Sequence, residues 1–225
     1  MRRPNLALLG LLLAALPVPA LAETEIDLSA NAGVVSDYRF RGLSLSDREP
    51  AIQGGVDLEA GPFFAGAWAS TIDDYEGADT ELDLYAGVQG TLGETTVRGG
   101  AYAYLYPGGE GVNYVELIAQ AERTFGPVTL GVEAALAPRQ TNVAAANRYI
   151  GLSSAFEAGA GWGFVVRGGY EDGFYDRKWD WEVGGSYTYG SLTASLAYVD
   201  SNHGAAHKSG RLGQGGLVGS LLAEF

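Results

Sequence analysis

The feature that most constrains this chain is an alternation of apolar and polar residues that recurs about twelve times. A period of two residues is typical of a β-strand with two different faces. The alternating segments are 26–34, 52–59, 82–89, 97–105, 115–122, 128–136, 150–157, 164–170, 179–189, 192–198 and 217–225. Segment 63–71 is also strand-like, but its two faces are ambiguous because Phe63 and Phe64 are both aromatic. Within the clear segments, no apolar row contains a charged residue.

The connections between these segments alternate strictly between two kinds. Short turns are expected near 60–61, 92–94, 125–126, 157–162 and 190, and longer polar connections near 41–49, 73–79, 107–111, 138–147, 171–178 and 200–212. A soluble barrel or sandwich would show the same rows, but barrels of the outer membrane have short turns at one end and long loops at the other. We therefore predict an all-β fold, a closed antiparallel transmembrane β-barrel of about 12 strands in an up-and-down meander, because an open sheet edge in lipid leaves unsatisfied backbone groups.

Aromatic residues near the predicted strand ends support the membrane interpretation, since such residues form girdles at the lipid boundary. They are Phe40, Phe125, Phe156, Tyr170, Trp179, Tyr189 and Phe225. The last of them ends the chain on an alternating segment. A terminal aromatic in this position resembles the signal read by the bacterial barrel-assembly machinery, which is therefore a predicted partner together with outer-membrane lipid and lipopolysaccharide.

The N-terminus has the three parts of a signal peptide. Arg2 and Arg3 are basic, residues 6–16 are apolar, and Ala20-Leu21-Ala22 is a cleavage site. The alternative is a membrane anchor, but the apolar run is shorter than the roughly 20 residues that span a bilayer. We predict a cleaved signal peptide over 1–22, a single barrel domain over 23–225, and a location in the outer membrane of a Gram-negative bacterium with both termini in the periplasm.

The charge and the lack of cysteine exclude several classes of function. The net charge is −13, which argues against binding nucleic acid through its phosphates. Without cysteine there is no disulfide, thiolate-bound metal or thiol nucleophile. No cofactor or metal site is predicted.

The polar row of the predicted strands would face the lumen, and it is strongly acidic. Its acids are Asp27, Asp57, Glu59, Glu81, Asp83, Glu116, Glu122, Glu133, Glu157, Asp180, Glu182 and Glu224. Against them stand Arg98 and Arg167, joined by Arg39 and Arg41 if the first strand continues past Asp37. The predicted pore-lining residues are Asp57, Glu59, Glu81, Asp83, Arg98, Tyr102, Glu116, Glu122, Glu133, Arg167, Asp180 and Glu182.

Acidic rings favour cations in a pore, so we predict a porin-like channel for small solutes that prefers cations. The alternative is a plugged structural or surface-binding barrel, in which these acids pair with the arginines and with Tyr85, Tyr102 and Tyr104. Twelve strands make a barrel wider than eight-stranded barrels filled by side chains and narrower than general porins.

An enzyme is not predicted. The only histidines are His203 and His207, in a glycine-rich connection that would not hold a catalytic group in place. Asp73, Asp74, Glu76 and Asp79 form an acidic group that could bind Ca²⁺ or the cations that bridge lipopolysaccharide, although such a run is more often only solvated.

Several segments of the chain resemble one family. They are 36–44 (SDYRFRGLS), 50–57 (PAIQGGVD), 66–70 (GAWAS), 114–117 (YVEL) and 196–200 (LAYVD). This pattern is similar to that of the TorF family of porins, also called Gcw_chp, and covers most of the chain after the signal peptide. The resemblance implies an outer-membrane barrel named as a porin, with no established substrate and no catalytic residue to carry over.

Overall fold

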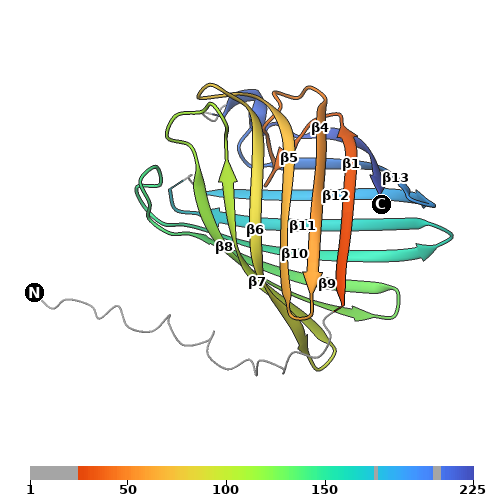
Figure 1. Cartoon of the computed structure of the whole chain (residues 1–225). Helices are drawn as coiled ribbons and strands as arrows, with labels where there is room; N and C mark the ends of the chain where they lie inside the picture. Colours follow the sequence, from red (N-terminus) through yellow and green to blue (C-terminus); the bar gives the residue numbers. More distant parts are fainter. Residues whose placement is uncertain (1–24, 175–176, 205–208) are drawn as a thin grey trace, which may run out of the picture.

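The computed structural model describes residues 25–174, 177–204 and 209–225 and shows a closed barrel of twelve antiparallel strands (Figure 1). Each strand pairs with its neighbours in the chain, and β1 pairs with β14, which confirms the predicted meander. The barrel strands are β1 (Ile26–Val35), β4 (Ala51–Ala60), β5 (Phe63–Tyr75), β6 (Ala78–Leu92), β7 (Thr95–Leu105), β8 (Tyr114–Phe125), β9 (Val128–Ala137), β10 (Asn147–Gly159), β11 (Trp162–Asp172), β12 (Lys178–Tyr189), β13 (Leu192–Ser201) and β14 (Gly216–Glu224). A hairpin of β2 (Arg39–Phe40) and β3 (Leu43–Ser44) and a 3₁₀ turn, η1 (Gly210–Gly213), lie in the connections.

The barrel buries polar groups and exposes apolar ones. Leu28 and Leu152 on the outer face are 71% and 66% exposed, whereas Lys178, Glu81 and Glu116 are among the most buried side chains. A soluble domain has the opposite distribution. Alternate residues of each strand therefore point to an apolar exterior and a polar interior, as the alternating rows predict.

The outer row is less free of charge than the sequence suggests, because several strands are longer than predicted. Strand β8 continues to Phe125 and adds Arg123 to its outer row, where it bonds to Glu94. Arg148, Asp172 and Asp200 also belong to the outer row, at the ends of β10, β11 and β13 that are opposite the two-residue turns. All four occupy strand ends, so the middle of the outer surface stays free of charge.

The structure defines the two faces of β5, which the sequence left ambiguous. Phe64 is 3% exposed and faces the interior, whereas Phe63 is 52% exposed and faces outward. Trp68 and Ser70 share the inner row with Phe64, and the outer row between Phe63 and Thr71 contains only alanine.

The two ends of the barrel differ in their connections. The turns 61–62, 93–94, 126–127, 160–161 and 190–191 have two residues each and lie at one end, here called the short-turn end. The opposite end, the long-loop end, carries the connections 36–50, 76–77, 106–113, 138–146, 173–177 and 202–215. The alternation is as predicted except over 73–79, where β5 and β6 continue and leave only Glu76 and Gly77 as the turn. The first and last described residues both lie at the short-turn end, and the predicted signal peptide, 1–22, lies outside the described residues.

The described part of the chain has no helix that is long and apolar enough to cross a membrane.

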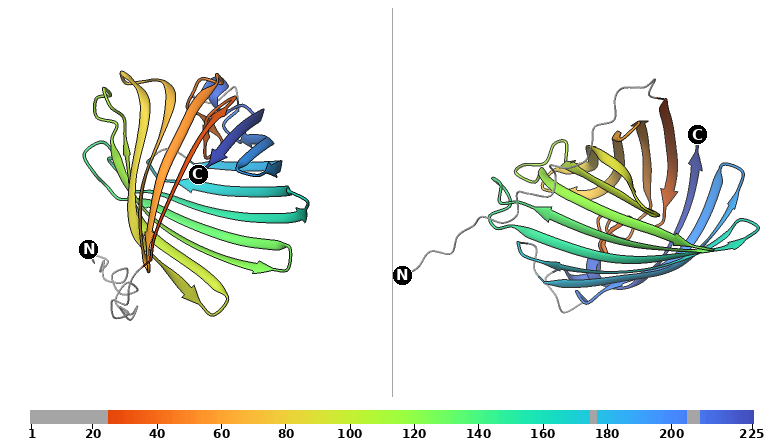
Figure 2. Two further views of the ribbon diagram at one scale, coloured as in Figure 1. Left: turned by 45° about the vertical axis from the view of Figure 1, so that its right-hand side comes forward. Right: turned by 90° about the horizontal axis from the view of Figure 1, so that it is seen from below.

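The seam between β1 and β14 is the shortest strand pairing of the barrel (Figure 2). Five residues, Asn31 to Val35, pair with β14, against ten pairs between β1 and β4. Ala30 adds two backbone hydrogen bonds to Phe225, of 3.2 and 2.9 Å. The terminal residue of the chain thus contributes directly to closing the barrel.

Candidate functional site: the lumen and its inserted hairpin

The connection after β1 folds into the barrel instead of extending from it. Strand β1 ends at Val35, and residues 39–44 form a small hairpin, here called the inserted hairpin. Its tip is Arg41 and Gly42, both with positive φ (47° and 81°), as in the tightest hairpin turns. The first strand therefore does not continue past Asp37, but Arg39 and Arg41 both reach the barrel interior from this hairpin.

A group of charged bonds fixes the base of the inserted hairpin. Asp37 accepts hydrogen bonds from Arg39 Nε (2.8 Å) and Ser44 Oγ (2.6 Å). Arg39 and Arg48 both donate to the carbonyl oxygen of Gln214, at 2.7 and 2.9 Å. The hairpin is thus tied to the connection before β14, on the neighbouring part of the barrel wall.

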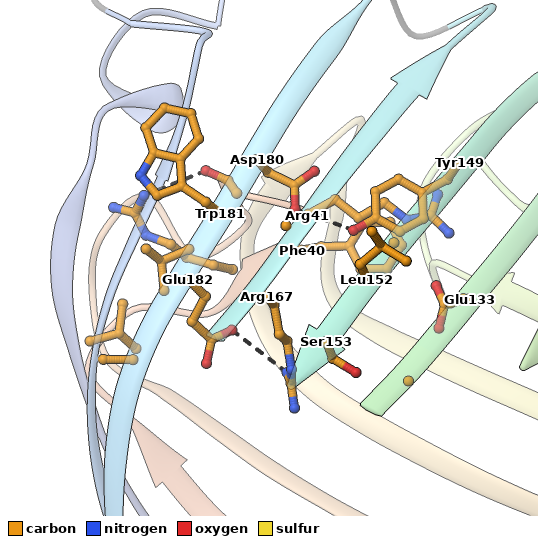
Figure 3. Close-up of a pocket in the computed structure, with 18 of the residues that line it drawn as sticks. Phe40, Arg41, Glu133, Tyr149, Leu152, Ser153, Arg167, Asp180, Trp181 and Glu182 are labelled. Carbon is orange, nitrogen blue, oxygen red and sulfur yellow. Dashed lines mark hydrogen bonds and ion pairs between the residues drawn. The ribbon is translucent and has the colours of Figure 1, made fainter. Parts of the chain in front are cut away.

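The tip of the hairpin spans the lumen to the opposite wall. Arg41 donates to both carboxylate oxygens of Glu116 on β8 (3.0 and 2.7 Å) and to Glu171 on β11 (3.3 Å). Its guanidinium also lies 4.2 Å from the ring centre of Tyr149 on β10 (Figure 3). Burial on its own would lower the pKa of Arg41, but Glu116 and then Glu171 outweigh it and raise this pKa, so the side chain is charged.

Lys178 completes this arrangement on β12. Its ammonium group lies 2.9 Å from Glu171 and donates a 2.5 Å hydrogen bond to the carbonyl oxygen of Arg41. Two basic and two acidic side chains, almost fully buried, thus form a neutral group, here called the charge quartet (Arg41, Lys178, Glu116 and Glu171). Bidentate contacts of this kind are the strongest that arginine makes with carboxylates.

The inserted hairpin divides the barrel interior into two cavities. The cavity on the short-turn side of the hairpin, here called the lumen cavity, has a volume of about 630 Å³. The second cavity, here called the vestibule, has about 490 Å³ and lies among the connections of the long-loop end. Phe40 and Arg41 line both cavities, so they form the partition between them.

The structure distributes the predicted pore-lining residues over several places. Glu122, Glu133, Arg167, Asp180 and Glu182 line the lumen cavity, and Arg167 lies 3.6 Å from Glu182 (Figure 3). Glu116 lines the vestibule. The remaining residues border neither cavity: Asp57, Glu59, Glu81, Asp83, Arg98 and Tyr102.

Five of these six residues, all but Asp83, contact neighbouring side chains of the wall. Asp57 accepts a 2.6 Å hydrogen bond from Tyr85, whose ring stacks on Tyr102. Glu59 accepts from Gln89, and Arg98 lies 3.8 Å from Glu59 and over the ring of Phe64. Glu81 is 1% exposed and accepts from Tyr106 at 3.3 Å. The acids thus do not form one continuous ring.

One of the predicted girdle aromatics lies elsewhere. Phe40 belongs to the inserted hairpin and packs inside the barrel, 5.7 Å from the ring centre of Tyr104. The outward positions of the other aromatics agree with the prediction, as Phe125, Trp179 and Tyr189 are 52%, 57% and 78% exposed.

Three members of this site are not among the residues predicted from the sequence: Glu171, Lys178 and Tyr149. Glu171 and Lys178 were expected in a loop, but they continue the inner rows of Arg167 and Asp180 by one or two steps. Both residues are found when each inner row is continued along the sequence, two residues at a time, until a turn residue is reached. Nothing in the local sequence reveals that Arg41 would meet them.

The groups considered for catalysis and metal binding are not assembled. His203 is buried, and its Nε2 lies 3.1 Å from the carbonyl oxygen of Arg177, while His207 lies outside the described residues. Within the described ranges, no group of three or more His, Cys, Asp or Glu residues could hold a metal ion. Asp73, Asp74, Glu76 and Asp79 belong to the ends of β5 and β6 and their turn.

The closed barrel has an apolar exterior, a polar interior cavity and a loop folded inside. These features place the fold in the class of porin-type β-barrels. The chain belongs to the Gcw_chp family, described as a bacterial protein of unknown function, whose sequence model matches residues 20–214. This confirms the family that the sequence resembles, while the narrower TorF assignment stays a prediction. A search of curated proteins finds no match.

Solved structures support the fold assignment. A NanC porin structure superposes with a TM-score of 0.59 at 10% identity, covering 88% of this chain and 99% of that one. The COG4313 outer membrane channel from Pseudomonas putida F1 gives 0.54 at 13% identity, covering 92% and 97%. At such low identity these similarities establish the architecture and not the solute.

Proposed function

We propose that this protein is a porin-like channel of the outer membrane that admits small solutes. The observation that supports this proposal most directly is the lumen cavity of about 630 Å³ inside a closed barrel. Its walls carry charged and polar side chains, which suit water and hydrophilic solutes. A channel needs no catalytic group, and we propose no enzymatic activity.

The proposed orientation places the short-turn end and both termini in the periplasm. Short periplasmic turns and longer outer loops are the rule for barrels of this kind. The signal peptide predicted over 1–22 would export the chain, and the apolar middle of the outer surface would contact lipid and lipopolysaccharide. Phe225, at the end of the seam strand, would be read by the barrel-assembly machinery.

We further propose that the channel prefers cations. Five carboxylates and three guanidinium groups line the lumen cavity. The acids are Asp37, Glu122, Glu133, Asp180 and Glu182, and the bases are Arg39, Arg41 and Arg167. Fixed acidic side chains in a narrow pore attract cations and repel anions. The excess is smaller than the sequence predicts, so the preference is expected to be moderate.

A plugged barrel is the second candidate, and the inserted hairpin is the observation that favours it. The charge quartet holds Arg41 across the lumen with both pairs almost fully buried. If this hairpin never moves, the two cavities stay separate and the barrel conducts no solute.

Planar-bilayer recording of the refolded protein in a KCl gradient tests the proposal. We expect discrete conductance steps and a reversal potential of the sign that indicates cation preference. A variant in which residues 37–49 are replaced by a short glycine-serine linker provides the comparison. Anion preference would contradict the selectivity, and conductance by this variant alone would establish the plugged barrel instead.

A further inference from the structure

The vestibule differs from the lumen cavity in its walls, and this difference points to a ligand. Its side walls carry aromatic and aliphatic side chains from strands and connections on several sides of the barrel. They include Phe40, Leu45, Ile72, Tyr75 and Tyr106. A volume of about 490 Å³ falls in the range of cavities that bind small molecules, and apolar walls with a few polar groups are typical of them.

Tyr106 contributes its ring to the vestibule, because its hydroxyl group is bonded elsewhere. The hydroxyl of Tyr106 donates to Glu81 on the neighbouring strand at 3.3 Å, so it is already used in the barrel wall. The ring of Tyr106 meets Tyr75 edge to face, with ring centres 4.9 Å apart, and Tyr75 is 39% exposed. Such walls offer π faces, which attract cations, and few of the hydrogen-bonding groups that a sugar requires.

The charges of the vestibule fall into two groups. At its floor, the charge quartet is neutral as a whole, because two bases pair with two acids. At its mouth lie Asp47, Asp73 and Asp74, of which Asp47 pairs with Arg211. Asp73 and Asp74 are exposed; Arg211 also feels the charge of Asp73, and Asp74 accepts a 2.8 Å hydrogen bond from the backbone N–H of Gly77. Among the described residues, the mouth thus carries three carboxylates against the single guanidinium group of Arg211, above an apolar cavity.

We propose that the vestibule is a binding site for small organic cations with an apolar body, such as aryl- or alkylammonium ions. The ammonium group would be held by Asp73, Asp74 and the ring of Tyr75, and the apolar body by Ile72 and Phe40. This inference rests on the proposed channel, because it names the solute class that collects above the partition. A ligand in this position contacts Phe40 and Arg41 directly, so its binding is coupled to the inserted hairpin.

Three probes of equal body and different charge test the inference: phenethylammonium, phenethyl alcohol and phenylacetate. Binding to the refolded barrel in detergent micelles is measured by ligand-observed NMR, which requires no current. We expect phenethylammonium to bind most tightly, the alcohol more weakly and phenylacetate least. Equal or tighter binding of phenylacetate, or no binding of any probe, would overturn the proposal.

Two variants separate the contributions of charge and ring. The double variant D73N/D74N should weaken the binding of phenethylammonium about fivefold, which is the effect of losing one contact between unit charges in water. The binding of the alcohol should not change. Tyr75→Ala should weaken both, because it removes the ring face. Asp79→Asn serves as the matched control, since Asp79 is exposed on the same hairpin but borders neither cavity. If Asp79→Asn has the same effect as D73N/D74N, the mouth of the vestibule is not the site.

Current block distinguishes failure of the site from failure of the channel. Binding by NMR without any conductance would refute the channel and leave the site standing. Conductance without binding, and without block by phenethylammonium, would refute the site and leave the channel standing.

Discussion

Replacing Arg41 by alanine tests the central feature of this structure, the partition between the two cavities. Arg41 donates three hydrogen bonds to carboxylates on β8 and β11, across the lumen from the hairpin, and its side chain is 6% exposed. Without Arg41, Glu116 keeps the 3.4 Å hydrogen bond from Tyr104 but no basic side chain of the described residues, whereas Glu171 keeps Lys178. The charge quartet then changes from neutral to a net charge of about −1, and the partition loses its longest side chain.

The electrostatic effect can be bounded from this change. One unit charge at about 4 Å changes the energy of a permeating ion by about 1 kcal/mol in water and by about 4 kcal/mol at an effective dielectric constant of 20. At the lower value the energy of a cation falls and that of an anion rises by about 1 kcal/mol each, about fivefold in opposite directions, so the ratio of cation to anion permeability should rise roughly 25-fold. We also expect a higher single-channel conductance, because the opening between the cavities widens.

The assay is single-channel recording with a reversal potential measured across a KCl gradient. Arg41→Met is the matched control, because it removes the charge but keeps a long side chain. It should change the permeability ratio as Arg41→Ala does but raise the conductance less. Breaking a buried ion pair costs roughly 3–5 kcal/mol, so heat-modifiable migration on gels must show that each variant is folded. A folded Arg41→Ala barrel with unchanged conductance and reversal potential would refute the assignment of Arg41 to the constriction.

Three further predictions concern the hairpin, the outer surface and the seam. Gly42→Ala should displace the hairpin tip, because φ is +81° and an added methyl group would lie 2.8 Å from the Cβ of Asp180. The expected result is faster trypsin cleavage in the hairpin. Gly90→Ala is the control, because a methyl group there meets no atom within 4 Å. Leu152→Arg should destabilise the barrel in bilayers by roughly 2–4 kcal/mol, as measured by urea unfolding. Ser153→Arg, at the next position, which faces inward, should destabilise it much less. Equal effects would contradict a lipid-facing outer row. Deleting Phe225 removes its two backbone bonds to β1 and should slow folding into liposomes, whereas an unchanged folding rate would show that the seam does not need it.

The strands could be predicted because each is determined by local alternation. Leu82 and Leu84 point to lipid and Glu81 and Asp83 to the interior whichever strands pair with β6, since successive side chains of a strand alternate by geometry. The closed topology then follows, because lipid does not tolerate an open edge. Errors occurred only at strand ends, where charges such as Arg123 interrupt the pattern without ending the strand.

The inserted hairpin could not be predicted in this way. Its tip residue Arg41 lies 75 positions from Glu116 and 130 from Glu171, and no periodicity links them. The segment reads as a polar loop, which would normally extend into solvent. Its tip is bonded inside the barrel by Glu116 and Glu171, and these two carboxylates come together only when the strands are closed into a ring.

The proposed cation preference would therefore depend on a few charges near the hairpin and not on the net charge of the chain. At physiological ionic strength charges are screened beyond about 8 Å, so the many acids at the turns have little influence on an ion at the partition. The neutral charge quartet contributes little field of its own. What remains is the modest acidic excess of the lumen cavity and the two exposed aspartates at the mouth of the vestibule. Because those groups face water, a preference that arises from them must weaken as salt is raised, whereas a preference set by the width of the partition would not.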